Sequence, residues 1–445
     1  MATTSAATSS RIAWGKSLVG RITCPNCWHL FPPEDVCFVS KHPVLIGDPV
    51  LGSNEYQRFA PTRFTPKGEA LDPNDIPSSE MACPRCHLPI SEALMEVPPL
   101  FISLIGSPAS GKSYYLTTMA WQLRSLLPKA GLAFSDADPL ANAALHEYEQ
   151  ALFMNPHPDQ PTEIRKTQVD DERLHKTATI DGVPIRFPLP FQFLSWPTPD
   201  HPNFAEAQRV GRVLVFYDNA GEDFRPGMER ADSAATQHLA RCSALFVMFD
   251  PTQDPRLLGL CRSQDPQLAH GLRPGANGPS VTVRQETFLK EAIVRLRRFL
   301  GLSQGHRLDK PLVVIVPKFD ILEGLSGISL AEEPYTGGNG AGGLRLKIPQ
   351  VERASEALRT MLRQYCPEFV ATAETVSENV RYIPVSSFGT SPELIERGDQ
   401  AFYGIRPRDI KPRWVTVPLM YCLSKWGSQL LTCTAATAQR RRANS

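Results

Sequence analysis

The chain has 445 residues and a mass of 49.3 kDa. At roughly 100–200 residues per domain, this length predicts two to three domains, or one large domain with an appendage. A hydrophobic content of 42% supports a sizeable core and excludes wholesale disorder. Because 47 Lys and Arg residues face 46 Asp and Glu residues, the net charge is +1, which argues against coating nucleic acid or an anionic membrane by charge alone.

The first 20 residues are expected to form a flexible tail. They begin with a stretch rich in Ala, Ser and Thr that lacks the apolar segment of a secretory signal. No run in the chain approaches the ~18 apolar residues of a membrane-spanning helix, so no membrane span is predicted. These features predict a cytoplasmic protein whose thiols stay reduced.

Two copies of one cysteine motif follow, Cys24-Pro25-Asn26-Cys27 and Cys83-Pro84-Arg85-Cys86. A Cys-x-x-Cys turn presents two thiolates toward one point, and two such turns supply the four ligands of a tetrahedral zinc site. We therefore predict a four-cysteine zinc ribbon over residues 21–97, with a loop-rich insertion at 31–80. The alternative is disulfides or scattered buried cysteines. His87, which follows Cys86, is expected to be a loop residue.

Beyond Pro98-Pro99, short apolar runs alternate with amphipathic segments. This alternation predicts an α/β fold of three αβα layers with a mostly parallel sheet. Alternating apolar residues around Asp181-Gly182 predict an antiparallel hairpin at the sheet edge. This domain spans 98–432, with insertions near 251–284 and 321–349, and a basic tail follows at 433–445. The predicted strands are 100–105, 212–217, 244–249, 311–316 and 381–385, and the predicted helices are 114–127, 230–240, 285–299, 351–364 and 415–431.

The first strand runs into a glycine-rich loop of the G-x-x-x-x-G-K-S pattern, which is the P-loop pattern. Glycine lets the backbone approach a phosphate closely, and successive N–H groups at a helix N-terminus form an anion site. Lys112 would bridge the β- and γ-phosphates, and the Ser113 hydroxyl would ligate Mg²⁺. The predicted nucleotide-binding residues here are Gly106, Ser107, Pro108, Ala109, Ser110, Gly111, Lys112, Ser113 and Tyr114.

A second strand ends in Asp218-Asn219-Ala220-Gly221-Glu222. A carboxylate at a strand tip opposite the loop can hold a Mg²⁺-bound water, and the Gly221 N–H can reach a γ-phosphate. We therefore predict Asp218 as a magnesium residue and Gly221 as a nucleotide residue.

These two motifs resemble the first and third motifs of Ras-like GTPases of the TRAFAC class. Two later stretches extend the resemblance, which covers about residues 98–432. Pro317-Lys318-Phe319-Asp320 resembles the base-recognition motif, and Ser386-Ser387 resembles the loop beside guanine. The Asp320 carboxylate can accept from the N1–H and the amine of guanine, whereas it would repel adenine N1. GTP is therefore preferred over ATP, although Pro317 lacks the side chain of the family's Asn or Thr. The alternative for Lys318 and Asp320 is a surface pair.

The resemblance also implies switch residues. A threonine between the P-loop and the hairpin should close over Mg²⁺. Thr162 and Thr167 both fit, and the alternative for each is an ordinary loop residue. Thr167, nearer the hairpin, is favoured as a catalytic residue together with Lys112. Glu222 stands where the family often has a water-orienting Gln, so we expect slow intrinsic turnover. Arg225 and Arg230 are either solvated or supply positive charge to the site.

A narrower resemblance joins the double Cys-Pro-x-Cys ribbon, the P-loop and a late Val-Pro-Leu helix. It is to bacterial double-GTPase proteins of prokaryotic conflict systems, and it implies a protein partner, specifically a second GTPase. The sparse basic residues between Arg21 and His87 disfavour nucleic acid as the partner.

Together, these features predict a GTP/GDP-binding, slowly hydrolysing, Mg²⁺-dependent switch whose zinc ribbon docks a partner. Two alternatives stay open. One is a P-loop ATPase or kinase, and the other is a non-enzymatic zinc-ribbon adaptor with a structural nucleotide.

Overall fold

A seven-stranded sheet forms the centre of the larger part of the molecule in a computed structural model. The structure describes residues 18–164, 173–219, 224, 235–261, 284–303, 305–323, 325, 327–337, 343–397, 400–426 and 430–431. The strand order is β11-β14-β15-β10-β16-β17-β20. The strands are β10 (Pro99–Gly106), β11 (Leu132–Asp136), β14 (Phe191–Pro197), β15 (Arg212–Asp218), β16 (Ala244–Met248), β17 (Leu312–Val316) and β20 (Val380–Pro384).

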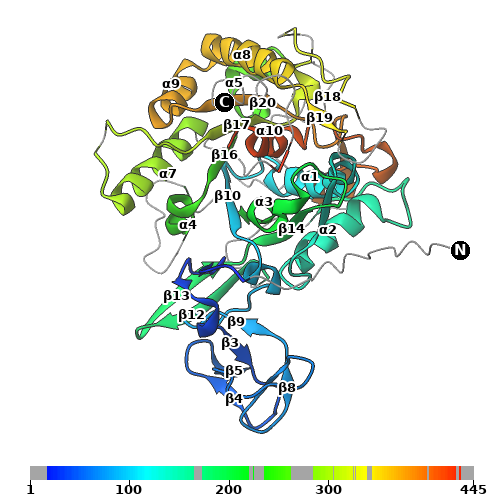
Figure 1. The fold of residues 1–445 in the computed structure, drawn as a ribbon. Coiled ribbons are helices and arrows are strands. Elements are labelled where there is room, and N and C mark those ends of the chain that lie inside the picture. Colours follow the sequence, from blue (N-terminus) through cyan, green and yellow to red (C-terminus); the bar gives the residue numbers. More distant parts are fainter. Residues whose placement is uncertain are drawn as a thin grey trace, which may run out of the picture.

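The sheet is parallel from β15 to β20. Only β14 runs in the opposite direction, so it pairs antiparallel both with β15 and with the edge strand β11. The predicted α/β class and mostly parallel sheet are thus confirmed. The strands β16 and β17 are buried along their whole length, which explains their unbroken apolar sequences. Helices lie on both sides of the sheet (Figure 1). They are α1 (Lys112–Leu126), α2 (Ala143–Phe153), α3 (Ala207–Val210), α4 (Ala235–Arg241), α5 (Pro255–Leu258), α7 (Gln285–Leu300), α8 (Ile348–Tyr365), α9 (Pro367–Val376) and α10 (Val417–Lys425).

Helix α7 shows why these segments form helices. It buries Phe288, Leu289, Ala292 and Ile293, whose spacing places them on one face of a helix. It ends at Gly301, whose φ of 65° is the left-handed conformation in which glycine commonly terminates a helix. None of the helices in the described ranges is long and apolar enough to cross a bilayer.

Two predictions about the sheet domain need correction. Strands β12 (His175–Ile180) and β13 (Val183–Pro188) form the predicted hairpin, but as a separate two-stranded sheet. The antiparallel edge of the main sheet is instead made by β14 and β11, because the backbone of β14 pairs with β15. Helix α10 is also shorter than the predicted 415–431, since it ends at Lys425.

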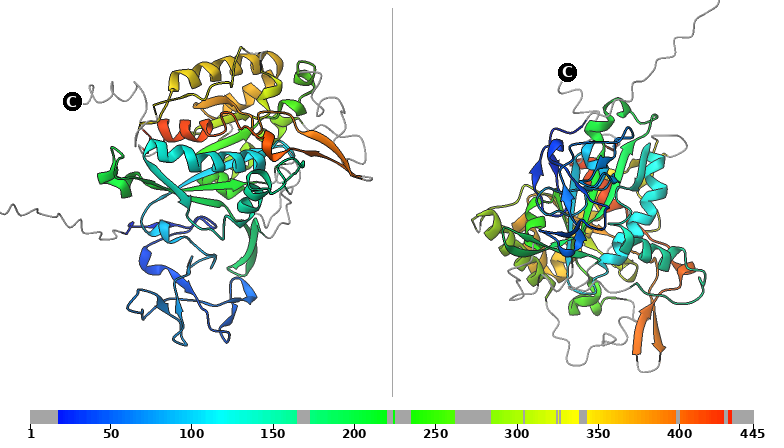
Figure 2. Two further views of the ribbon diagram at one scale, coloured as in Figure 1. Left: turned by 90° about the vertical axis from the view of Figure 1, so that its right-hand side faces the viewer. Right: turned by 90° about the horizontal axis from the view of Figure 1, so that it is seen from below.

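The N-terminal module, residues 18–97, is built from short strands and turns (Figures 1 and 2). The 31–80 segment, predicted to be loop-rich, contains strands of two to five residues rather than loop alone. The strands of the module are β1 (Ile22–Thr23), β2 (Leu30–Phe31), β3 (Cys37–Val39), β4 (Ile46–Asp48), β5 (Gly52–Tyr56), β6 (Arg58–Phe59), β7 (Ala70–Leu71), β8 (Pro77–Ser78) and β9 (Met81–Ala82).

The module is joined to the sheet domain through Tyr217 of β15. The Trp28 Nε1–H donates to the Tyr217 hydroxyl at 2.9 Å, and that hydroxyl donates to the Pro25 carbonyl at 2.6 Å. The His238 ring stacks on Tyr217 with centroids 4.9 Å apart and also lies 6.4 Å from the Trp28 ring. All of these side chains are buried. The β12–β13 hairpin lies beside the module (Figure 1), where the Thr179 amide donates to the Val50 carbonyl.

We expect Tyr217→Phe to lower the free energy of unfolding by about 1–3 kcal/mol. The substitution leaves two buried groups, the Trp28 indole N–H and the Pro25 carbonyl, without their partner at position 217. Denaturant unfolding measures the change. Tyr365→Phe, at a partly exposed tyrosine of α8, is the matched control. Equal stability of the two variants would contradict this role for the Tyr217 hydroxyl.

Candidate functional site

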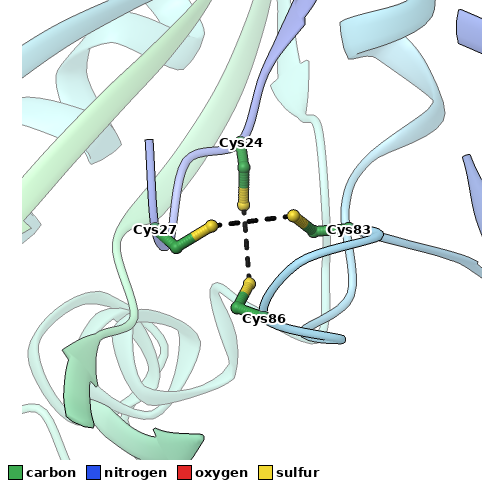
Figure 3. A group of neighbouring side chains, drawn as sticks. All are labelled: Cys24, Cys27, Cys83 and Cys86. Atoms are coloured by element: carbon green, nitrogen blue, oxygen red, sulfur yellow. Dashed lines mark hydrogen bonds between the residues drawn. The ribbon is translucent and has the colours of Figure 1, made fainter. Parts of the chain in front are cut away.

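The two cysteine motifs meet in one buried cluster. The sulfur atoms of Cys24, Cys27, Cys83 and Cys86 lie within 4.8 Å of one another and point to one centre (Figure 3). The Sγ atoms are 3.8 Å apart for Cys24 and Cys86 and 3.6 Å apart for Cys27 and Cys83. These distances exceed the roughly 2.05 Å of a disulfide. They agree with the separation of about 3.8 Å that four Zn–S bonds of ~2.3 Å impose in a tetrahedron. The cluster therefore fits one zinc ion.

The two turns have the same backbone conformation. The amide N–H groups of Asn26 and Arg85 each donate at 3.4 Å to the sulfur two residues earlier. Trp28 and His87 occupy equivalent positions, with φ of 56° and 58°, and their amides donate to the carbonyls of Cys24 and Cys83. As predicted, His87 is a loop residue. Its ring binds the Asp48 carboxylate at 2.8 Å and lies outside the cysteine cluster.

The electrostatics of the cluster require a cation when all four sulfurs are ionised. Burial raises the pKa of the Cys24 and Cys86 thiols well above the usual range. Hydrogen bonds with the neighbouring thiols, first that with Cys24, lower the pKa of Cys27 and Cys83. Four thiolates in so small a buried volume would repel one another strongly. Zn²⁺ bound at their centre would offset this repulsion, because a coordinating thiol is deprotonated by the metal.

The glycine-rich loop lies between β10 and the N-terminus of α1, at the carboxyl edge of the sheet. Gly106 packs against β16 so closely that a Cβ would lie 2.8 Å from the Met248 Cβ. Gly111 has a φ of 87°, which an L side chain rarely adopts. The buried Ser110 hydroxyl in this loop has no hydrogen-bond partner in the described part of the chain. A buried hydroxyl of this kind costs about 1–3 kcal/mol unless a bound group satisfies it.

Lys112 and Ser113 begin α1 inside this loop. The Lys112 ammonium group, whose residue is 7% exposed, donates to the carbonyls of Gly106 and Ser107 at 3.2 and 3.1 Å. The Ser113 hydroxyl donates to the Asp218 carboxylate at 2.6 Å. The structure thus brings together the two residues predicted to hold Mg²⁺. A hydroxyl and a carboxylate are oxygen ligands of the type that Mg²⁺ prefers.

The predicted base-recognition residues follow β17 and β20, at the same edge of the sheet. The Ser386 hydroxyl donates to the Asp320 carboxylate at 2.5 Å and accepts from the Gly389 amide. The Phe319 amide donates to the Val385 carbonyl, so the two loops are joined by backbone as well. Lys318, with a φ of 54°, donates to Asp250 at 2.8 Å. Ser387, at intermediate exposure, follows Ser386 in this loop.

The remaining predicted residues are placed less completely. Thr167, Gly221, Glu222, Arg225 and Arg230 lie outside the described residues.

Thr162 pairs through its backbone with Ile405, next to β22 (Gln400–Gly404), which forms a hairpin with β21 (Glu393–Arg397). Two residues further along, the Ile164 amide donates to the Tyr114 hydroxyl at 3.1 Å. The segment that carries Thr162 therefore lies beside the beginning of α1.

Sequence reasoning missed two buried residues of this edge, Asp250 and Gln253. Both follow β16. Asp250 directly precedes the short helix η6 (Pro251–Gln253), and Gln253 is the last residue of that helix. Gln253 contacts the glycine-rich loop, and Asp250 contacts Lys318. Neither belongs to a recognisable motif. The available signal was the position of Asp250, shortly after a buried parallel strand, where polar side chains collect at the carboxyl edge.

No protein-family model matches the chain. A putative ESX-1 scaffolding and assembly protein, SaeC, from Mycolicibacterium smegmatis is 27% identical to it over 371 residues. The similarity covers 79% of this chain and 83% of that protein, so it extends over most of both sequences.

We expect elemental analysis to find about one zinc per chain, and the double variant Cys24→Ser, Cys83→Ser to lose it. One sulfur is removed from each turn, so neither half of the cluster keeps two ligands. Stability should fall as well, because the metal holds the two turns together. The matched control is Cys242→Ser, since Cys242 is buried but lies in the sheet domain. A soluble, metal-free wild-type protein would contradict the zinc site.

Proposed function

We propose that the protein is a P-loop nucleotide switch that binds GTP and GDP with Mg²⁺ and hydrolyses GTP slowly. The observation that carries the proposal is the convergence of separate motifs at one edge of the sheet. Lys112 and Ser113 follow β10, Asp218 ends β15, and Asp320 and Ser386 follow β17 and β20. Ligands of open α/β sheets bind at the carboxyl ends of the strands.

The order of the strands supports the same proposal. The strand that leads into the glycine-rich loop, β10, lies between β15 and β16 in the sheet. Its neighbour β15 delivers Asp218 to Ser113, so a Mg²⁺ ion held there would lie beside the loop. A phosphate in the loop would face the N-terminus of α1 and the Lys112 ammonium group. Both features stabilise negative charge.

Guanine is the base that fits Asp320 best. The Ser386 hydroxyl binds one oxygen of the Asp320 carboxylate and so orients it. A carboxylate held in this way accepts from the two adjacent donors of guanine, whereas adenine presents an acceptor at N1. We therefore propose GTP over ATP as the nucleotide.

The similarity to a scaffolding and assembly protein favours a role in protein–protein contacts. In this proposal the N-terminal module docks a protein partner, and a second GTPase is the partner that the family resemblance implies. Tyr217 and Asp218 are consecutive in β15, so the module and the proposed Mg²⁺ site share one strand. The same similarity supports the second candidate function, a non-enzymatic adaptor in which the nucleotide is structural.

The test is a side-by-side titration of GTP and ATP in the presence of Mg²⁺. We expect tighter binding of GTP, loss of all nucleotide binding in Lys112→Ala, and at least about a tenfold loss of GTP affinity in Asp320→Ala. The matched controls are Lys129→Ala and Asp309→Ala, because both side chains are exposed and outside the proposed site. Both controls should bind GTP as the wild type does.

The outcomes separate the candidates. Equal affinities for GTP and ATP would contradict the guanine preference, and faster ATP than GTP turnover would favour an ATPase or kinase. GTP binding without any phosphate release would favour the adaptor. Absence of nucleotide binding in a folded wild-type protein would overturn the proposed function as a whole.

A further inference from the structure

Pro317 precedes the proposed base-recognition residues, and it offers neither a side-chain hydrogen bond nor a backbone N–H. The position of Lys318 and Asp320 relative to the glycine-rich loop must therefore be set by other groups. The side chains of Gln253 and Asp250 lie between these two loops, and no sequence motif assigned a role to either of them.

Gln253 contacts the glycine-rich loop through both ends of its amide. Its Oε1 accepts from the Ser107 hydroxyl at 2.7 Å, and its Nε2 donates to the Pro108 carbonyl at 3.0 Å. The same Nε2 donates to the Asp250 carboxylate at 3.0 Å. Gln253 is only 9% exposed, so these hydrogen bonds are protected from water. Buried amides of this kind are expensive to leave unpaired.

Asp250 carries the contact on to the base-recognition loop. Its Oδ2, which accepts from Gln253, also accepts from the Lys318 ammonium group at 2.8 Å. Its Oδ1 accepts from the amide and hydroxyl of Thr252. The carboxylate is fully buried, and a buried charge is tolerated when it is paired and hydrogen-bonded. The resulting chain of bonds runs from Ser107 through Gln253 and Asp250 to Lys318.

The segment between the two loops is itself fixed to a helix. Gln285, the first residue of α7, accepts from the Asp250 amide at 2.7 Å and donates to the Asp250 carbonyl at 2.8 Å. The bridge is thus anchored on α7 and holds one loop at each end. Its length is set by three successive hydrogen bonds of 2.7, 3.0 and 2.8 Å.

We infer that Gln253 is a positioning residue for nucleotide specificity, which sets the spacing between the phosphate-binding loop and the base-recognition loop through Asp250. The inference rests on the proposed function, since it concerns how that site selects a guanine nucleotide. A diphosphate contacts the glycine-rich loop alone, whereas a guanine nucleotide must reach both loops at once. The bridge therefore contributes to binding of GDP and not to binding of pyrophosphate.

The test compares GDP and inorganic pyrophosphate, each titrated with Mg²⁺ into the full-length wild type and the Gln253→Ala variant. We expect Gln253→Ala to weaken GDP about tenfold and pyrophosphate less than about twofold, since the lost hydrogen bonds set the spacing between the two loops, which only GDP must span. Gln122→Ala is the matched control. Gln122 is half-buried and donates to one carbonyl, that of Pro412, but it lies further along α1.

A second variant, Ser107→Ala, removes only the hydroxyl at the loop end of the bridge. We expect a loss of GDP affinity of about threefold. The double variant should be no weaker than Gln253→Ala alone, because both substitutions break the same bond. Ser107→Ala by itself keeps the inference testable if Gln253→Ala does not fold, which circular dichroism would reveal.

Equal losses for GDP and pyrophosphate in Gln253→Ala would overturn the inference, because they would indicate general damage to the glycine-rich loop. An unchanged GDP affinity in Gln253→Ala would overturn the inference too. In either case, the proposed function would still stand if the wild type binds GDP and Lys112→Ala does not. If the folded wild type binds no GDP, the proposed function fails and the inference falls with it.

Discussion

The alternation of side chains at the end of β15 links the two parts of this molecule. Successive residues of a strand point to opposite faces, so Tyr217 and Asp218 serve different neighbours. Tyr217 binds Trp28 and Pro25 of the N-terminal module, and Asp218 binds Ser113 at the start of α1. A displacement of this strand end would therefore disturb both contacts. The contact of Tyr217 also reaches the cysteine cluster, because Pro25 is inside the first Cys-x-x-Cys turn.

The parallel sheet imposes the second constraint, since it brings the carboxyl ends of its strands to one edge. Gly106 approaches Met248 of the adjacent strand too closely for any Cβ, which seats the glycine-rich loop against β16. Polar residues that follow neighbouring strands then meet across short distances, as Asp320 and Ser386 do. Buried polar groups at such an edge must find partners. The Asp250 and Gln253 side chains meet this requirement by bonding the loops on either side.

The parts of the fold that were predictable carry a local pattern. Apolar runs identified the parallel strands, and the doubled Cys-Pro-x-Cys motif identified the four cysteines that meet in space. The hairpin around Asp181-Gly182 shows the limit. Alternating residues predict the two strands of a hairpin and the turn between them. They do not predict which other strand the hairpin will pair with, because that strand belongs to a distant segment. The short strands within residues 31–80 were missed, because two to five residues are too few to show a clear period.

The sequence by itself determined the α/β class, the metal-binding turns and the loops that the site is built from, because each depends on contacts within a few residues. Tertiary structure alone decided which distant side chains complete the site. The pairing of Lys318 with Asp250 spans 68 residues, and that of Ser107 with Gln253 spans 146. Such pairs depend on strand order and on the packing of helices against the sheet, which are properties of the folded chain as a whole. For the same reason, no sequence motif marks Gln253, although it connects, through Asp250, two loops that each carry a recognisable motif.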